Sequence, residues 1–257
     1  LVVGLCLVVA LGLVIGVNFA NDYSDGVRGT DDHRVGPQRL VGSGAAAPGR
    51  VRAAAFCCFG VSGLAGLAAV AVTGHWWLLA VGVACVLAAW FYTGGRHPYG
   101  YLGLGEVFVL IFFGLVATAG TDYLLCGHVS AAGWAAAVAM GLTADGVLVT
   151  NNLRDIASDT AAGKRTLETR LGDRASRLLY AGLVVAVAVC CVLVAALSTW
   201  WALLGLLGAA LLVPAARTIL GGAVGLRLVS TLRSTSMGEL VLSLGLLAGV
   251  AVARLTA

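Results

Sequence analysis

The chain begins LVVGLCLVVALGLVIGVNFANDYSDGVRG over residues 1–29, an apolar run that ends in a cluster of amides and carboxylates. A helix needs about 20 apolar residues to cross the hydrocarbon core of a bilayer, and this run supplies them. The whole chain is similar, because its 257 residues are 60% hydrophobic and only 11% charged. A soluble domain carries about 25% charged residues. We therefore predict an all-α polytopic protein embedded in a lipid bilayer.

Eight apolar stretches are each near the membrane-spanning length. They predict transmembrane helices at 1–20, 53–73, 76–93, 104–121, 131–150, 178–197, 199–216 and 237–253. The second and third stretches are nearly contiguous, which predicts a tight helical hairpin. The pairs Gly12/Gly16 and Gly245/Gly249 have the small-xxx-small spacing that lets membrane helices approach closely. Each pair is therefore a candidate helix contact.

Lysine and arginine lie almost entirely on one side of this eight-span arrangement. The loops on that side are 21–52, 94–103, 151–177 and 217–236, and they hold 5, 1, 6 and 3 basic residues in that order. Together these are 15 of the 16 basic residues in the chain. The positive-inside rule places these loops in the cytoplasm. Leu1 would then lie outside the cytoplasm. Since the chain starts without Met and inside an apolar run, we expect an incomplete N-terminus that lacks one earlier helix.

The first polar motif opens a cytoplasmic loop. Asn18, Asp22 and Asp25 are spaced four and three residues apart, so they share one helix face, with Asn21 at its edge. The bases that follow are Arg28 and Arg34. A solvated loop after a membrane helix could have this composition, but the amide and the first carboxylate lie at the membrane end, which favours a binding site.

The second polar motif opens another loop on the same side. Asn152, Asp155 and Asp159 share one helix face through spacings of three and four, and Lys164 and Arg165 follow. A single pair of aspartates at this spacing is a weak pattern. Two such motifs on one membrane face, each with amides before and bases after, form a much more specific pattern.

Closely spaced carboxylates repel one another unless a cation lies between them, and oxygen-only ligands suit Mg²⁺. We predict that four aspartates are both metal ligands and catalytic residues: Asp22, Asp25, Asp155 and Asp159. The neighbouring bases would bind a diphosphate. A neutralised diphosphate is a leaving group, so an allylic diphosphate would ionise to a cation in an apolar, water-free site. The seven cysteines and four histidines have no zinc-ligand spacing.

Two further polar features lie outside the two acidic motifs. Tyr99, Tyr101 and Glu106 lie in the loop and helix start around 98–106. They belong either to an ordinary interfacial aromatic belt or to one side of a binding site for an aromatic substrate. Asp145 lies inside an apolar run, where ionisable groups are costly and usually functional. It either faces a cavity together with Asn152 or lies near the external end and reaches water.

Three segments resemble the UbiA-type intramembrane prenyltransferase superfamily. They are NDYSDGVRGTDDHRVGPQRLVGSG (21–44), PYGYLGLGEVFVLIFFGLVATAGT (98–121) and NNLRDIASDTAAGKRTLETRLG (151–172). They are most similar to the branch that prenylates 1,4-dihydroxy-2-naphthoate in menaquinone synthesis. The resemblance covers the whole chain and implies a single prenyltransferase domain over 1–257. Family members have nine helices, which agrees with one missing at the N-terminus here.

The resemblance implies Mg²⁺-dependent transfer of a polyprenyl chain from polyprenyl diphosphate to 1,4-dihydroxy-2-naphthoate, with loss of CO₂, to give demethylmenaquinone. The four aspartates match the family's two acidic motifs. The substrate-binding positions would be Asn18, Asn21, Arg28, Arg34, Asn152, Lys164 and Arg165, with Tyr99, Tyr101 and Glu106 toward the aromatic acceptor. It also implies a multi-pass cell-membrane protein with cytoplasmic active-site loops and no nucleic-acid partner. Oligomeric state is left open.

Two alternatives remain on the residues alone. A member of the same superfamily could use another aromatic acceptor, because charge and motifs do not distinguish acceptors. A cation-coupled membrane transporter would also use intramembrane acids, but near the bilayer midplane and beside broken helices. Here the acids lie at one face of the membrane with bases beside them, which favours the enzyme.

Overall fold

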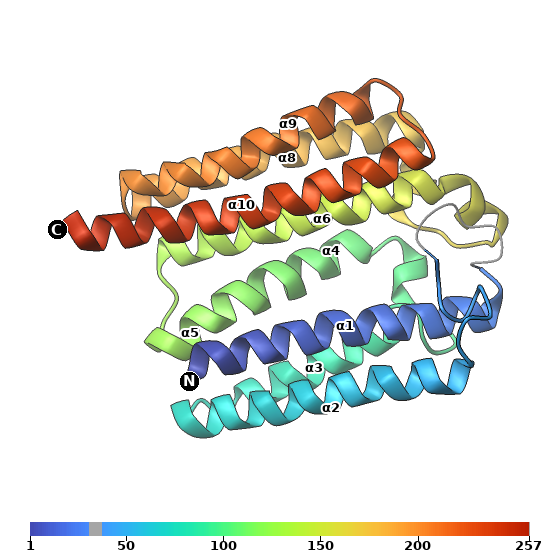
Figure 1. The fold of residues 1–257 in the computed structure, drawn as a ribbon, viewed down its shortest axis with the longest axis horizontal. Coiled ribbons are helices and arrows are strands. Elements are labelled where there is room, and N and C mark those ends of the chain that lie inside the picture. The colour runs from blue at the N-terminus through green and yellow to red at the C-terminus, as the bar shows by residue number, and fades with distance from the viewer. Residues whose placement is uncertain (31–37, 257) are drawn as a thin grey trace. The chain divides into compact units, whose positions relative to one another are not determined.

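The computed structural model describes residues 1–30 and 38–256, and helices are the only regular secondary structure in those ranges. Seven of the described helices are long and apolar enough to cross a membrane (Figure 1). They are α1 (Val2–Arg28), α2 (Pro48–Thr73), the continuous helix α4–η2–α5 (Gly105–Val109, Leu110–Ala119, Gly120–Cys126), α6 (Ala131–Ala161), α8 (Asp173–Leu197), η3–α9 (Trp200–Gly205, Leu206–Leu220) and α10 (Leu226–Thr256). An eighth apolar helix, α3 (Leu78–Phe91), is shorter and forms the predicted hairpin with α2. The all-α polytopic fold is confirmed.

Several helices extend beyond the predicted spans. α1 continues through the first acidic motif to Arg28 and ends at Gly29, whose φ of 74° is left-handed. α6 continues through the second motif to Ala161, and α10 begins at Leu226 rather than at 237. Hydropathy marks only the segment within hydrocarbon, whereas backbone hydrogen bonds carry a helix on into the polar region. Both acidic motifs are therefore helical, as their spacing predicted.

The chain divides into two compact units, which are described separately. Unit 1 comprises residues 1–105, 121–128 and 158–166, and in it α1 packs along α2. A Cβ atom on Gly12 would lie 2.2 Å from Ser62 Oγ, and one on Gly16 would lie 2.5 Å from Phe59 Cε1. These glycines therefore form a helix contact, as their spacing predicted.

Unit 2 comprises residues 106–120, 129–157 and 167–257, and its core draws side chains from α6, α8, α9 and α10. Gly245 and Gly249 on α10 lie against η3, where added Cβ atoms would each be 2.4 Å from a backbone carbonyl oxygen. The second predicted glycine contact is therefore also confirmed. Gly208 on α9 lies equally close to the α10 backbone, because an added Cβ atom would be 2.2 Å from the Leu242 nitrogen.

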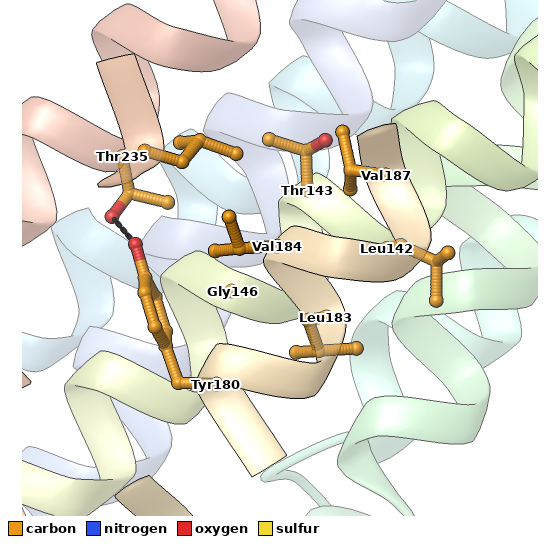
Figure 2. Close-up of a pocket in the computed structure, with 9 residues that line it drawn as sticks. Leu142, Thr143, Gly146, Tyr180, Leu183, Val184, Val187 and Thr235 are labelled. Atoms are coloured by element: carbon orange, nitrogen blue, oxygen red, sulfur yellow. Dashed lines mark hydrogen bonds between the residues drawn. The ribbon is translucent and has the colours of Figure 1, made fainter. Parts of the chain in front are cut away.

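A small cavity lies in unit 2 between α6, α8, α9 and α10 (Figure 2). Beside it, the hydroxyl groups of Tyr180 on α8 and Thr235 on α10 form a hydrogen bond of 2.7 Å. The cavity has a volume of about 10 Å³, roughly that of one water molecule. It is too small for an organic ligand.

Candidate functional site

Asp22 anchors the segment that follows the first acidic motif. Its two carboxylate oxygens accept hydrogen bonds from the backbone N–H groups of Leu40, at 2.8 Å, and Val41, at 2.9 Å. The approach is close, because a Cβ atom on Gly26 would lie 2.6 Å from Val41 Cβ. Asp22 therefore holds residues 40–41 against the last turns of α1.

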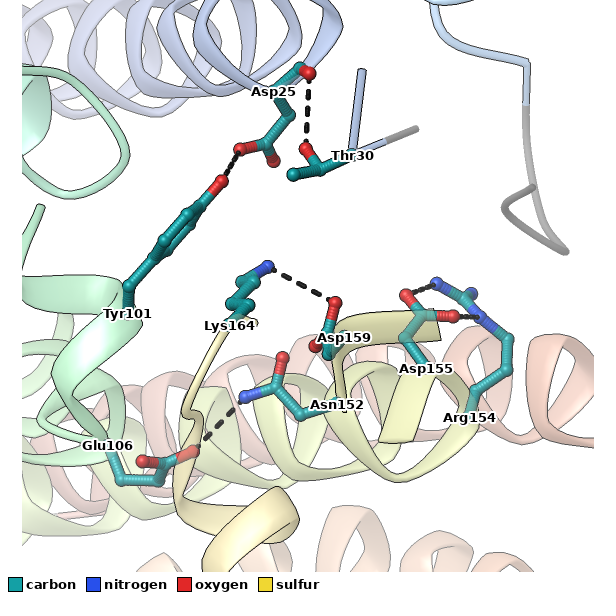
Figure 3. Close-up of polar contacts among 9 residues, drawn as sticks. All are labelled: Asp25, Thr30, Tyr101, Glu106, Asn152, Arg154, Asp155, Asp159 and Lys164. Carbon is teal, nitrogen blue, oxygen red and sulfur yellow. Dashed lines mark hydrogen bonds and ion pairs between the residues drawn. The ribbon is translucent and has the colours of Figure 1, made fainter. Parts of the chain in front are cut away.

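Asp25 is joined to the third polar segment through Tyr101, on the single turn η1 (Tyr99–Leu102). The Tyr101 hydroxyl donates to Asp25 Oδ1 at 2.7 Å (Figure 3). Burial and the neighbouring Asp25 carboxylate raise the pKa of Tyr101, so the phenol stays protonated at neutral pH and keeps donating. This bond links residues 76 positions apart in the chain.

Two cations lie over the Tyr101 ring. Arg28 Cζ is 5.5 Å and Lys164 Nζ is 5.3 Å from the ring centroid, within the range of cation–π attraction. Lys164 also forms an ion pair with Asp159 Oδ1 at 3.7 Å, and the Arg165 N–H donates to the Tyr101 carbonyl at 3.2 Å. Unit 1 thus gathers Asp25 of the first motif, and Asp159 with Lys164 of the second, around one tyrosine.

The remaining polar residues of α1 differ in their environment. Arg28 donates to the carbonyls of Thr93 and Gly95, and the Thr93 hydroxyl donates to Asn21 Oδ1 at 2.8 Å. Both α1 residues therefore hold the loop that precedes Tyr101. Asn18 is exposed, and its amide donates to the Val14 carbonyl of its own helix at 2.8 Å.

Asp155 lies on α6 one turn before Asp159 and is paired with its neighbour. Arg154 Nε and Nη2 donate to the two Asp155 oxygens at 2.7 and 2.6 Å. The Arg154 side chain is only 1% exposed, so this is a desolvated pair. The sequence analysis did not single out Arg154, although its position inside the second motif was an available signal.

A second polar cluster lies in unit 2. The Asn152 amide donates to Glu106 Oε1 across a long 3.4 Å contact (Figure 3). Glu168, on the short helix α7 (Leu167–Leu171), is fully buried. Burial and the negative charge of the adjacent Glu106 raise the pKa of Glu168 well above its ordinary value, which favours a protonated carboxyl at neutral pH. Sequence reasoning missed Glu168.

Asp145 is 4% exposed, and its carboxyl group lies within electrostatic reach of Glu106. The alternative that Asp145 reaches water is therefore wrong. A cavity shared by Asp145 and Asn152 stays a prediction.

Three predicted residues remain to be placed. The Tyr99 hydroxyl donates to the Ala88 carbonyl at 2.8 Å, and burial raises the pKa of Tyr99. Arg165 has an exposed side chain, and its backbone N–H contacts Tyr101 as described. Arg34 lies outside the described residues.

The acidic residues fit Mg²⁺ by their donor chemistry, since both motifs offer carboxylate and amide oxygens. In the described part of the chain, no three Asp, Glu, His or Cys side chains form a metal-binding group. Mg²⁺ rarely uses such all-protein cages, because it is usually held by one or two carboxylates together with substrate phosphates. Asp25 and Asp159, with Lys164 and Arg28 beside them, match that pattern.

These apolar, membrane-length helices define a polytopic helical membrane protein. Residues 1–223 match the UbiA prenyltransferase family, and the chain belongs to that family.

Three relatives are named 1,4-dihydroxy-2-naphthoate octaprenyltransferase. The Mycobacterium tuberculosis protein is 49% identical over 98% of this chain and 86% of its own length. The Mycobacterium leprae protein is 50% identical over 92% of this chain and 80% of its own. The Escherichia coli protein is 38% identical over 97% of this chain and 84% of its own.

Proposed function

We propose that this chain transfers a polyprenyl group from polyprenyl diphosphate to 1,4-dihydroxy-2-naphthoate, with loss of CO₂, to form demethylmenaquinone in menaquinone biosynthesis. Family membership and the names of relatives up to 50% identical support this reaction and acceptor. The structural observation that carries the proposal is the cluster of Asp25, Tyr101, Asp159 and Lys164. It combines carboxylates for a metal with a base for a diphosphate.

Each residue of this cluster has a distinct role in binding the donor. Lys164 and Arg28 attract the diphosphate, and the Tyr101 hydroxyl fixes the direction of the Asp25 carboxylate. Asp25 and Asp159 would hold Mg²⁺, which when bound neutralises the diphosphate and makes it a better leaving group. The apolar helices give the prenyl chain a lipid-like environment and exclude water, which would quench an allylic cation.

The orientation follows from the distribution of basic residues. The loops beside the two acidic motifs belong to the side that holds 15 of the 16 lysines and arginines. We place that side in the cytoplasm, in a cell membrane, where the positive-inside rule applies and a water-soluble naphthoate has access.

The proposed reaction is tested with membranes that contain the chain, supplied with 1,4-dihydroxy-2-naphthoate, labelled polyprenyl diphosphates of several lengths and Mg²⁺. We expect a product whose mass reports the acceptor, the chain length and the loss of CO₂. Excess EDTA should stop the reaction and added Mg²⁺ should restore it. A product with only a different aromatic acceptor would overturn the naphthoate assignment. Ion flux through liposomes without any prenylated product would favour a transporter instead.

Tyr101→Phe is expected to lower activity about 10- to 150-fold, because a hydrogen bond to a charged group contributes roughly 1.5–3 kcal/mol. The phenyl ring keeps its contacts with Arg28 and Lys164, but the Asp25 carboxylate loses the hydroxyl that orients it. Initial rates measured against Mg²⁺ and polyprenyl diphosphate concentration check this prediction.

The matched control for Tyr101→Phe is Tyr180→Phe, which removes a comparable hydroxyl contact, to Thr235 in the core of unit 2. The control should lose some stability but keep its rate and Mg²⁺ requirement. Equal rate losses in the two variants would show that the Tyr101 hydroxyl supports only the fold.

A further inference from the structure

Four buried carboxyl oxygens in unit 2 accept no hydrogen bond within the described chain. They are Glu106 Oε2, Asp145 Oδ1, and both oxygens of Glu168. The Asn152 amide donates to Glu106 Oε1 at 3.4 Å and also lies close to Glu168. Buried polar atoms without partners are costly and rare, so this concentration of acceptors requires an explanation.

Protons alone do not satisfy these acceptors. Adjacent carboxyl groups can share a proton, as Glu106 and Glu168 are placed to do. Such a shared proton supplies one hydrogen-bond donor and leaves the other carboxyl oxygens without one. A ligand that brings its own hydrogen-bond donors fits the site better.

The two glutamates are close in sequence to two residues of the donor-binding cluster. Glu106 follows Tyr101 by five residues, and Glu168 follows Lys164 by four.

We propose that Glu106 and Glu168 form a subsite that binds a phenolic hydroxyl of the aromatic acceptor. This inference rests on the proposed function, which supplies a dihydroxy acceptor. A carboxylate on the ligand would be repelled by the two glutamates, whereas a hydroxyl would donate to them. In 1,4-dihydroxy-2-naphthoate the hydroxyl at position 4 lies away from the carboxylate. The subsite therefore takes that hydroxyl and orients the ligand's carboxylate away from itself.

The test measures binding of two ligands to purified, full-chain protein in nanodiscs without any prenyl donor. The ligands are 1,4-dihydroxy-2-naphthoate and 1-hydroxy-2-naphthoate, which lacks only the hydroxyl at position 4. The wild-type protein should prefer the dihydroxy ligand by about tenfold or more, as expected when a site built for a hydroxyl meets its deoxy analogue. Glu168→Gln should reduce this preference to within about twofold, because the glutamine amide would itself donate to Glu106 and occupy the acceptor that the ligand hydroxyl needs.

The preference ratio separates a specific contact from general damage, since a distorted site would weaken both ligands together. Glu239→Gln, at a partly buried glutamate on α10 outside the subsite, is the matched control and should keep the wild-type ratio. If Glu168→Gln does not fold, Glu106→Gln provides the same measurement. A wild-type protein without the preference, or a folded glutamine variant that retains it, would overturn the subsite. Failure of the proposed function is seen separately, as absence of prenylated product from wild-type membranes.

Discussion

Asp25→Asn is expected to reduce prenyl transfer by about 10²–10³-fold, the usual cost of removing one group that stabilises charge in a reaction. Asparagine is isosteric and its amide oxygen can still accept the Tyr101 hydroxyl, so the local fold should persist. The lost property is the negative charge that would hold Mg²⁺ beside the diphosphate. Initial rates at increasing Mg²⁺ concentration should show a smaller maximum and a higher Mg²⁺ requirement.

Asp122→Asn provides the comparison for Asp25→Asn, because it makes the same chemical change on α5, in unit 1. It should leave the rate and the Mg²⁺ requirement within about twofold of the wild-type protein, as is usual for substitutions away from a site. An Asp25→Asn protein with more than half of wild-type activity would exclude Asp25 from the metal site.

The largest expected effect on stability is that of Gly208→Ala, between α9 and α10. The new Cβ atom would lie 2.2 Å from the Leu242 nitrogen and 2.5 Å from the Gly238 oxygen, so two backbones would have to separate. Overpacking of this kind typically costs about 1–3 kcal/mol, and here no flexible side chain can move aside. Thermal unfolding in detergent, followed by tryptophan fluorescence, should show a clear fall in Tm.

Gly182→Ala on α8 is the control for Gly208→Ala, because no atom lies within 4 Å of its added Cβ. Alanine is the better helix former by about 1 kcal/mol, so this variant should be unchanged or slightly more stable. Opposite signs for the same substitution would identify the contact as the cause. A similar Tm for the two variants would contradict the close approach of α9 and α10.

The features that the sequence predicted well are those determined locally. Membrane spans depend on hydropathy, and the shared face of Asn18, Asp22 and Asp25 depends only on helical spacing. The glycine pairs of α1 and α10 were predictable for the same reason, since close approach requires small residues at one-turn intervals. Helix ends were less predictable, because a helix can continue beyond the hydrocarbon without any change in hydropathy.

The partners of the polar residues could not be predicted, because they depend on contacts between distant segments. Asp22 resembled a simple metal ligand, yet it also binds the backbone of residues 40–41. Glu168 lies in the basic stretch KRTLETRLG, whose composition is typical of a solvated loop. Its burial beside Glu106 is a product of tertiary packing. Metal ligation by the four aspartates stays a prediction.

Tyr101 couples the two acidic motifs through its hydrogen bonds. Its hydroxyl is bound to Asp25 at the end of α1, while its carbonyl is bound to Arg165 beside Lys164. A shift of this single turn would move a carboxylate of one motif and a base of the other at the same time. Ligand binding at one motif should therefore change the affinity of the other, and by thermodynamic linkage the effect must be reciprocal.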